Sequence, residues 1–228
     1  MMIQGVLFDL DGTLLDSAPD LVAALNHVRE SEGMAPVEVG AYRRFVSRGA
    51  LGLINAGMPQ ADEAQLERRK TKLLDHYAGN SMNQTKPFDG IAESLDTLAS
   101  WGIPWGIVTN KPEFLTLPIL EHLGWKALAG CVICGDTLAW KKPHPAPVTI
   151  ACELLRLPPE KVVMVGDDLR DIESGRKAGA HTAWAAYGYV NGEVSDEDLA
   201  GSFILDAPAD LLSILPQSDA QFSVPPSS

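Results

Sequence analysis

The sequence predicts an α/β fold, in which a parallel sheet forms the core and a group of helices is inserted after its first strand. The apolar run of residues 3–8 ends at Asp9-Leu10-Asp11-Gly12, which indicates a buried strand followed by a turn. Only helical spacing of apolar residues follows, from Ser17 to Lys86. After Pro87, strand-like and helix-like segments alternate, as right-handed crossovers in a parallel sheet require. This order is typical of a Rossmann-like core with an inserted all-α domain.

The order of the predicted elements divides the chain into three parts. Residues 1–16 and 87–215 form the predicted core, residues 17–86 the inserted helical cap, and residues 216–228 a tail. Because the tail is rich in Ser, Pro and Gln, we expect it to be disordered.

Individual elements follow from periodicity and from breaker residues. In the cap no strand is expected, and helices are predicted from Ser17 to Gly33, over Val37–Phe45, up to Gly57 and over Asp62–Tyr77. Core helices are predicted over Ile91–Trp101, Glu113–Leu123, Ala146–Leu155 and Asp171–Ala178. Further core strands are predicted over Trp105–Thr109, Cys131–Cys134, Val162–Val165 and Thr182–Ala186, with Phe203–Leu205 and a short helix near Leu211 at the periphery.

Composition excludes several classes of function. The chain has 228 residues, of which 46% are hydrophobic and 21% charged, enough to bury a sizeable core. A net charge of -12 without a run of Lys or Arg argues against binding to nucleic acid or to an anionic membrane. No segment approaches the roughly 18 apolar residues of a membrane span, and Asp9 interrupts the N-terminal run too early for a signal peptide. We therefore expect a cytoplasmic protein.

Three cysteines, Cys131, Cys134 and Cys152, are an odd number for a chain without a secretion signal, which favours reduced thiols. Cys131 and Cys134 have the spacing of a zinc half-site or a redox pair. In a strand, however, that separation directs the two sulfur atoms to opposite faces. We therefore favour a structural role.

Polar residues follow several predicted strands at the point where each strand ends. Asp9 and Asp11 are two residues apart, so their side chains leave an extended chain on the same side. Similar clusters follow predicted strands at residues 108–111 (Val-Thr-Asn-Lys) and 166–171 (Gly-Asp-Asp-Leu-Arg-Asp), and one more, at residues 142–145 (Lys-Pro-His-Pro), comes from a loop. Ligands of parallel sheets bind beyond the carboxyl ends of the strands. One Asp-x-Asp-Gly sequence alone is equally typical of a turn, but four clusters indicate a site.

In order, spacing and strand context, the four clusters match the phosphatase branch of the haloacid dehalogenase superfamily, which the chain resembles from Ile3 to about Tyr189. The inserted helices resemble the first type of cap (C1) of that superfamily. The sequences Val-Thr-Asn-Lys-Pro and Gly-Asp-Asp-Leu-Arg-Asp-Ile-Glu-Ser-Gly look most like those of phosphatases for phosphoglycolate and for N-acetylmuramate 6-phosphate. Phosphoglycolate is the first expectation for the substrate and N-acetylmuramate 6-phosphate the alternative.

The resemblance implies a role for each acidic residue. Hydrolysis of a phosphomonoester needs an in-line nucleophile, a cation and a proton for the leaving alcohol. Asp9 would be the nucleophile that forms an aspartyl-phosphate, and Asp11 the acid and then the base. Asp9, the backbone carbonyl of Asp11 and Asp167 would hold Mg²⁺. Asp171 would act behind these ligands or through a water molecule, whereas Asp168 is expected to cap a helix.

Other residues would contact the substrate. The resemblance implies that Lys142 holds the nucleophile and the phosphate together, while Thr13, Thr109 and Asn110 contact the phosphate. A turn-shaping role for Thr13 and a helix-capping role for the other two stay open. Lys111 is expected near the site, with a solvated side chain favoured over a contact.

In the glycine-flanked cap loop, Arg48 is our candidate for a carboxylate or hydroxyl at the far end of the substrate, with a solvated arginine as the alternative. Tyr187 and Tyr189 could line the entrance, although ordinary packing is favoured.

The expected partner is a small phosphorylated metabolite. A sugar phosphomutase of the same superfamily is an alternative, which would require a bisphosphate and would return the phosphoryl group to a sugar. A dehalogenase needs neither a metal nor a general acid, so Asp11 and the 166–171 cluster argue against it. A non-catalytic scaffold would have no use for four complete clusters. The oligomeric state cannot be read from the sequence.

Overall fold

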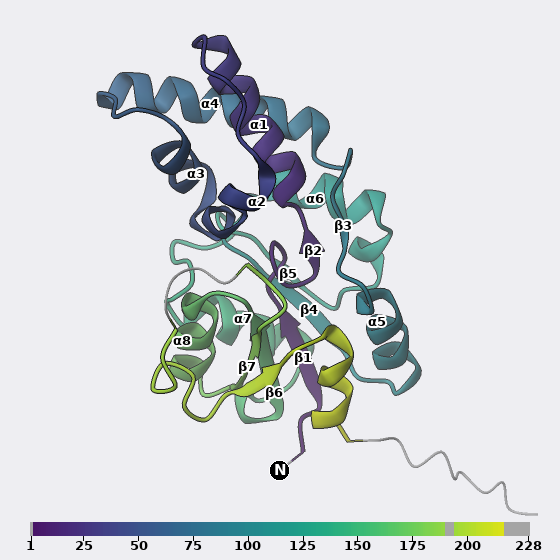
Figure 1. The fold of residues 1–228 in the computed structure, drawn as a ribbon. Helices are drawn as coiled ribbons and strands as arrows, with labels where there is room; N and C mark the ends of the chain where they lie inside the picture. The colour runs from purple at the N-terminus through teal and green to yellow at the C-terminus, as the bar shows by residue number, and fades with distance from the viewer. Residues whose placement is uncertain (1, 190–193, 217–228) are drawn as a thin grey trace, which may run out of the picture.

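The computed structural model describes residues 2–189 and 194–216 and confirms the predicted α/β fold (Figure 1). Six parallel strands form the sheet, in the order β5-β4-β1-β6-β7-β8. These strands are β1 (Gly5–Phe8), β4 (Trp105–Val108), β5 (Val132–Ile133), β6 (Val162–Gly166), β7 (His181–Ala185) and β8 (Phe203–Leu205). The first strand of the chain therefore lies inside the sheet, with β4 on one side and β6 on the other.

The register of the central strands brings their carboxyl ends to one level. Phe8, the last residue of β1, pairs with Ile107 of β4 and with Val165 of β6. The residues that follow these three strands consequently emerge at the same edge of the sheet, where ligands bind in parallel sheets.

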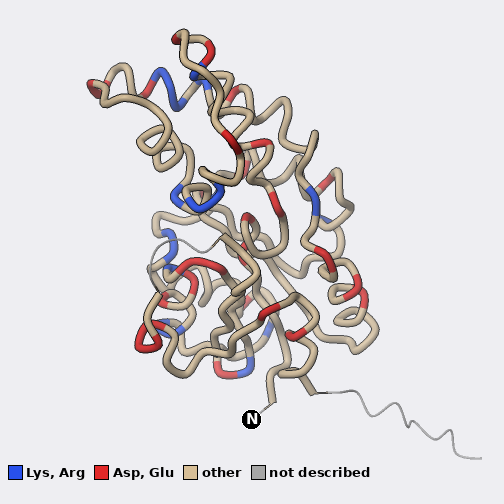
Figure 2. The backbone as a smooth tube through the Cα atoms, viewed as in Figure 1, with Lys and Arg blue, Asp and Glu red and all other residues tan. Residues whose placement is uncertain are grey.

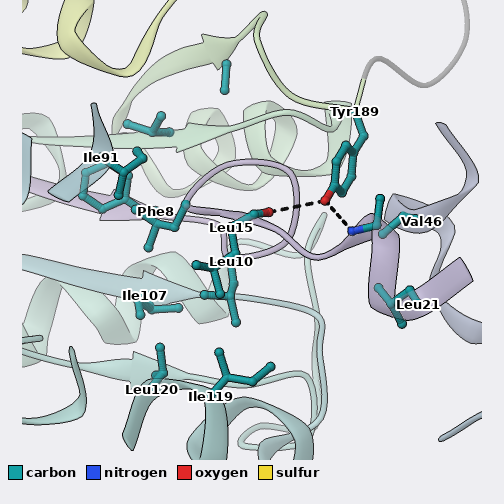
Figure 3. Packing of buried hydrophobic residues seen from close by; sticks show 14 of the residues in the cluster. Phe8, Leu10, Leu15, Leu21, Val46, Ile91, Ile107, Ile119, Leu120 and Tyr189 are labelled. Carbon is teal, nitrogen blue, oxygen red and sulfur yellow. Dashed lines mark hydrogen bonds between the residues drawn. The ribbon is translucent and has the colours of Figure 1, made fainter. Parts of the chain in front are cut away.

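Both faces of β1 are buried, as expected for a central parallel strand. Phe8 packs on one face with Ile107 and Val165, and Figure 3 shows Phe8 and Ile107 within this cluster. Leu7, the preceding residue, packs on the opposite face with Val108. This alternation divides the core into two layers, one on each side of the sheet.

Helices cover both layers of the core. The core helices are α5 (Ile91–Ser100), α6 (Glu113–His122), α7 (Ala146–Leu155) and α8 (Leu169–Ala178). Buried residues of α5 and α6 belong to the layer of Phe8, and those of α7 belong to the layer of Leu7. Helix α7 spans the residues that the sequence predicted. It follows Pro145, and Arg156, the residue after its end, adopts the left-handed conformation.

The remaining helices lie together beyond the carboxyl edge of the sheet, at the top of Figure 1. They are α1 (Ala18–Ser31), α2 (Val39–Tyr42), α3 (Gly49–Gly57) and α4 (Glu63–Asn80), with a 3-10 segment at Arg43–Arg48. Asp62 caps α4 by accepting a hydrogen bond from the Gln65 amide. Helix α4 packs along α1, so the two longest cap helices form one layer.

Two predictions for the cap were wrong. Strands β2 (Leu15–Asp16) and β3 (Lys86–Pro87) form an antiparallel pair, although no second strand was expected before Pro87. Two residues are too few for an alternating pattern to be visible. The helix expected over Val37–Phe45 is only the four-residue α2, followed by the 3-10 segment. No residue of α2 is buried and it contains Gly40, so it lacks the apolar face that extends a helix.

The C-terminal elements are peripheral, as predicted. Strand β8 forms one edge of the sheet, and a 3-10 segment at Pro208–Ile214 packs against α5. The predicted disordered tail falls largely on residues 217–228, which lie outside the described residues. Among the described helices, none combines the length and hydropathy that a bilayer crossing requires. Figure 2 shows acidic and basic residues interspersed over both the core and the cap.

Candidate active site

Three acidic side chains meet at the carboxyl edge of the sheet. Asp9 follows β1, Asp167 follows β6, and Asp171 lies in the first turn of α8. One carboxylate oxygen of each residue lies within 4.8 Å of the other two. The structure thus brings together Asp9, Asp167 and Asp171, three of the acidic residues selected from the sequence.

Lys142 supplies a positive charge inside this group. Its Nζ lies 2.9 Å from Asp9 Oδ1 and 2.6 Å from Asp171 Oδ1, and its side chain is only 2% exposed. The ammonium also donates to the carbonyl oxygen of Val108, at 2.6 Å. Burial opposes the charge, but the carboxylates of Asp171 and Asp9 outweigh it and raise the pKa of Lys142.

Asn110 fixes the backbone of this lysine. Its Nδ2 donates to the carbonyl oxygen of Lys142 at 2.9 Å, and its Oδ1 accepts from the Lys142 amide at 3.1 Å. The side chain predicted to contact phosphate is therefore engaged with the neighbouring loop. Thr109, by contrast, is buried at the end of β4, and its hydroxyl accepts from the Lys111 amide.

Asp167 is buried among hydrogen-bond donors that carry no charge. Its carboxylate accepts from the Thr13 hydroxyl (3.1 Å), the Tyr189 amide (3.0 Å) and the Ser47 hydroxyl of the cap (3.3 Å). Burial, and then the charges of Asp9 and Asp171, raise the pKa of Asp167 well above its ordinary value. Among the described residues, the ammonium of Lys142 pairs with Asp9 and Asp171 but not with Asp167, so three carboxylates lie together with one paired ammonium. This excess of hard, negatively charged oxygens fits a divalent cation.

The raised pKa of Asp167 predicts how the stability of the metal-free protein depends on pH. The folded protein retains a proton that the unfolded chain releases near pH 3.8, so the contribution of Asp167 to the free energy of unfolding should fall as the pH rises above about 4. Urea unfolding in chelator at a series of pH values measures this change. The variant Asp167→Asn isolates it, because its stability relative to wild type should increase with pH. A difference that is independent of pH would contradict the assignment.

Glycines allow the turn after β1 to approach Asp167. Gly12 has φ +86°, and a Cβ atom there would lie 2.2 Å from Asp167 Oδ2. A Cβ atom on Gly188 would lie 2.2 Å from the Gly12 carbonyl oxygen. Any larger residue at either position would displace the turn or the carboxylate.

The two tyrosines beside Gly188 pack against the same turn, as the sequence favoured. The Tyr187 hydroxyl donates to the Thr13 carbonyl oxygen at 3.1 Å. Tyr189 is buried, and its hydroxyl accepts from the Ala18 amide and lies 2.9 Å from an acceptor oxygen of Asp16 and 3.4 Å from the carbonyl oxygen of Leu15 (Figure 3).

Asp11 faces a different set of partners from Asp9. Its Oδ1 accepts from the Ser17 hydroxyl at 2.5 Å, and Lys111 Nζ lies 3.0 Å from both of its carboxylate oxygens. The expectation that Lys111 is solvated was wrong, because its side chain is 6% exposed and also donates to Tyr77 of α4. Burial opposes its charge, but Asp11 and Tyr77 raise the pKa of Lys111.

A cavity of about 270 Å³ lies above these groups, between the sheet edge and the cap. Asp9, Asp11, Thr109, Asn110 and Lys142 line it on the core side, and Arg48 lines it on the cap side. The Arg48 guanidinium carbon lies 5.4 Å from the centre of the Phe45 ring. Among the described residues, Thr13 does not line the cavity, and its hydroxyl instead donates to the Asp167 carboxylate. The apolar part of the lining includes Leu21, Val46, Ala50, Leu74 and Leu115.

The first turn of α8 joins the core to the cap. Asp168 caps this helix by accepting from the Arg170 amide, as predicted, and Asp171 Oδ2 accepts from the Asp168 amide. Arg170 pairs with the Asp168 carboxylate and donates to the Ser47 carbonyl oxygen in the cap. Sequence patterns gave no sign of the contacts of Ser47 and Arg170, because these residues are 123 positions apart.

The cysteines take no part in the site. All three are free and buried, and Cys131 and Cys134 flank the two residues of β5. Burial raises the pKa of Cys131 to about 12, which disfavours the thiolate needed for metal binding or redox chemistry.

Comparison with known proteins agrees with this geometry. The family model for haloacid dehalogenase-like hydrolases matches residues 6–185. An N-acetylmuramic acid 6-phosphate phosphatase from Pseudomonas aeruginosa is 38% identical over 216 residues, 94% of this chain and 96% of the relative. A phosphoglycolate phosphatase from Xylella fastidiosa is 44% identical over 188 residues, which cover 82% of each chain.

Solved structures show the same fold. A crystal structure described as a predicted phosphoglycolate phosphatase from Haemophilus somnus aligns with a TM-score of 0.83 at 27% identity, covering 94% of this chain and 98% of that one. The family match and the phosphatase relatives establish that the chain belongs to the haloacid dehalogenase-like hydrolases and is a phosphoric monoester hydrolase.

Proposed function

We propose that this enzyme hydrolyses a small phosphomonoester in two steps, with Asp9 as the group that is transiently phosphorylated. The observation that carries the proposal is the position of Asp9, which faces the cavity beside Lys142 and Asp167. In the first step an Asp9 oxygen attacks phosphorus, and the bond from phosphorus to the substrate alcohol breaks. In the second step water attacks phosphorus, inorganic phosphate leaves, and the Asp9 carboxylate is regenerated.

Neighbouring residues support these two steps. Asp11 gives a proton to the departing alcohol and takes one from the attacking water, since it lines the same cavity as Asp9. Lys142 lies close enough to Asp9 to offset the repulsion between the carboxylate and the phosphate dianion. The Thr109 hydroxyl lies at the end of β4, where it can contact the transferred group. Asn110 contributes by holding the backbone of Lys142.

Mg²⁺ is the proposed cation. Asp9, Asp167 and the backbone carbonyl of Asp11 would hold it, and the hard oxygens of the two carboxylates suit it. Bound there, it would neutralise phosphate oxygens and so reduce their repulsion of the nucleophile. Asp171 acts behind these residues, because its two oxygens are already engaged with Lys142 and with the Asp168 amide.

The cavity bears on the choice between the two substrates named for the relatives. Phosphoglycolate is small and polar at both ends, so it would leave the apolar wall formed by Leu21, Val46 and Leu74 in contact with water. The acetyl and lactyl methyl groups of N-acetylmuramate 6-phosphate would cover that wall. Arg48, on the cap side, is the candidate partner for the carboxylate that both substrates carry. The cavity therefore favours N-acetylmuramate 6-phosphate, with phosphoglycolate as the second candidate.

A panel of phosphomonoesters tests this proposal. We expect release of inorganic phosphate with Mg²⁺, the highest kcat/KM for N-acetylmuramate 6-phosphate, and loss of activity in excess chelator. Phosphate release without any added bisphosphate distinguishes a phosphatase from a sugar phosphomutase. Activity that survives complete chelation would contradict the metal role. A preference for phosphoglycolate would contradict the substrate assignment alone.

A cytoplasmic location stays a prediction from the sequence.

A further inference from the structure

Asp11 is connected to the helical cap through one buried lysine. Lys111 follows β4 in the core, and its Nζ lies 3.0 Å from each carboxylate oxygen of Asp11. The same nitrogen donates to the hydroxyl of Tyr77, at 2.9 Å. Tyr77 lies on α4 and is completely buried. A side chain of the cap therefore contacts, through Lys111, the residue proposed to move protons.

All three N–H bonds of the Lys111 ammonium have a partner. Two point to the oxygens of Asp11 and one to Tyr77, and the side chain is 6% exposed. Although Lys111 lines the cavity, it has no donor left for a substrate oxygen. Its contacts suit it to orient Asp11 instead of binding the substrate.

Three contacts hold the carboxylate of Asp11 in place. The Ser17 hydroxyl and Lys111 both donate to Oδ1, and Lys111 also donates to Oδ2. These contacts fix both carboxylate oxygens of Asp11 in one orientation beside Asp9, and Lys111 supplies two of them.

We propose that Tyr77 and Lys111 are positioning residues that hold Asp11 as the base for hydrolysis of the phosphorylated enzyme. This inference rests on the proposed function. In the step concerned, the oxygen of water bonds to phosphorus and the bond from phosphorus to the Asp9 oxygen breaks. The proton of the water goes to Asp11, and inorganic phosphate leaves. Because Tyr77 belongs to α4, the base is fully oriented only when the cap is in place over the core.

The position of Tyr77 and Lys111 beside Asp11 predicts which of the two reaction steps depends on them. Formation of the phosphorylated enzyme from p-nitrophenyl phosphate needs no acid, because nitrophenolate leaves readily without a proton. Its hydrolysis needs an oriented base. Loss of Tyr77 or Lys111 contacts should therefore slow the second step and leave the first nearly unchanged.

Rapid-mixing kinetics with p-nitrophenyl phosphate and Mg²⁺ tests the proposal in Tyr77→Phe and Lys111→Met. We expect a burst of nitrophenolate approaching one equivalent per enzyme, with a burst rate constant within about threefold of wild type. The slow phase should fall by roughly ten- to a hundredfold, the loss expected when a catalytic group is misplaced. Because the two residues act as one unit, the double variant should be no slower than Lys111→Met alone.

Matched variants separate these effects from general damage. Tyr42→Phe removes a hydroxyl from another cap tyrosine, and Lys177→Met removes an exposed lysine of α8. Both should keep the rate constants of wild type. Thermal unfolding of every variant shows whether it is folded. If Lys111→Met does not fold, Tyr77→Phe decides the question, because it keeps the buried ring.

Two results would overturn the proposal: burst and slow phases that are reduced equally, or rate constants that do not change in Tyr77→Phe. A rise in KM alone would also overturn it, since it would make Lys111 a substrate ligand. The proposed function fails in a different way, namely if wild-type enzyme releases no phosphate from any phosphomonoester of the panel.

Discussion

Asp9→Asn should lower phosphate release by roughly four to six orders of magnitude, the loss typical of a missing covalent nucleophile. An amide has the shape of the carboxylate but does not attack phosphorus, and it is a weaker ligand for a cation. Steady-state release of inorganic phosphate from the best substrate of the panel, at saturating Mg²⁺, measures the effect.

The stability of Asp9→Asn provides the control. Asp9 lies among the carboxylates of Asp167 and Asp171, so removal of its charge relieves repulsion in the metal-free protein. Its melting temperature in chelator should therefore equal or exceed that of wild type. Asp96→Asn, an exposed change on α5, should keep full activity. Phosphate release by Asp9→Asn near the wild-type rate would contradict the nucleophile assignment.

Lys142→Met should have the largest effect on folding. Among the described residues, it removes the one ammonium that pairs with Asp9 and Asp171, and it leaves the buried charge of Asp171 and the partly buried charge of Asp9 without that partner. Breaking a buried pair in this way costs about 3–5 kcal/mol of unfolding free energy. Urea denaturation in chelator measures the loss. Phosphate release should also fall sharply, because no cation then offsets the repulsion between Asp9 and the substrate.

Lys141, the residue before Lys142, provides the matched control for the stability of Lys142→Met. Lys141 is exposed, so Lys141→Met should change the unfolding free energy by no more than about 0.5 kcal/mol. Mg²⁺ should restore part of the stability of Lys142→Met by replacing the lost positive charge. If Lys142→Met unfolds within about 1 kcal/mol of wild type, the carboxylates are not held as the contacts indicate.

The sequence predicted those parts of the fold that repeat a clear pattern over several residues. Strand β6 and helix α7 were found nearly to the residue because β6 is a short run of mostly β-branched residues that ends at Gly166, and α7 is an apolar segment that follows Pro145. The β2–β3 pair was missed because each strand has two residues. Helix α2 was overextended because apolar residues in that segment face partly outward and do not form a buried stripe.

For the site, the sequence identified Asp9 and Asp167, which directly follow strands, and Lys142, which lies in the loop between β5 and α7. Asp9 and Asp167 come together because β1 and β6 are parallel, in register and end at one edge. Lys142 reaches them from its loop. The pairing of Lys111 with Tyr77 was not predictable, although Tyr77 lies on the apolar side of α4. It joins a core loop to the cap, and no local pattern records which polar groups meet across such a distance.

The phosphorylated enzyme is the species that tests the account most directly. Enzyme mixed with substrate and Mg²⁺, quenched in acid within a single turnover and digested, can be analysed by mass spectrometry. We expect one added phosphoryl group on the peptide that contains Asp9, removed by hydroxylamine as an acyl phosphate should be, and absent from Asp9→Asn. A phosphoryl group on any other residue, or full activity in Asp9→Asn, would contradict the account.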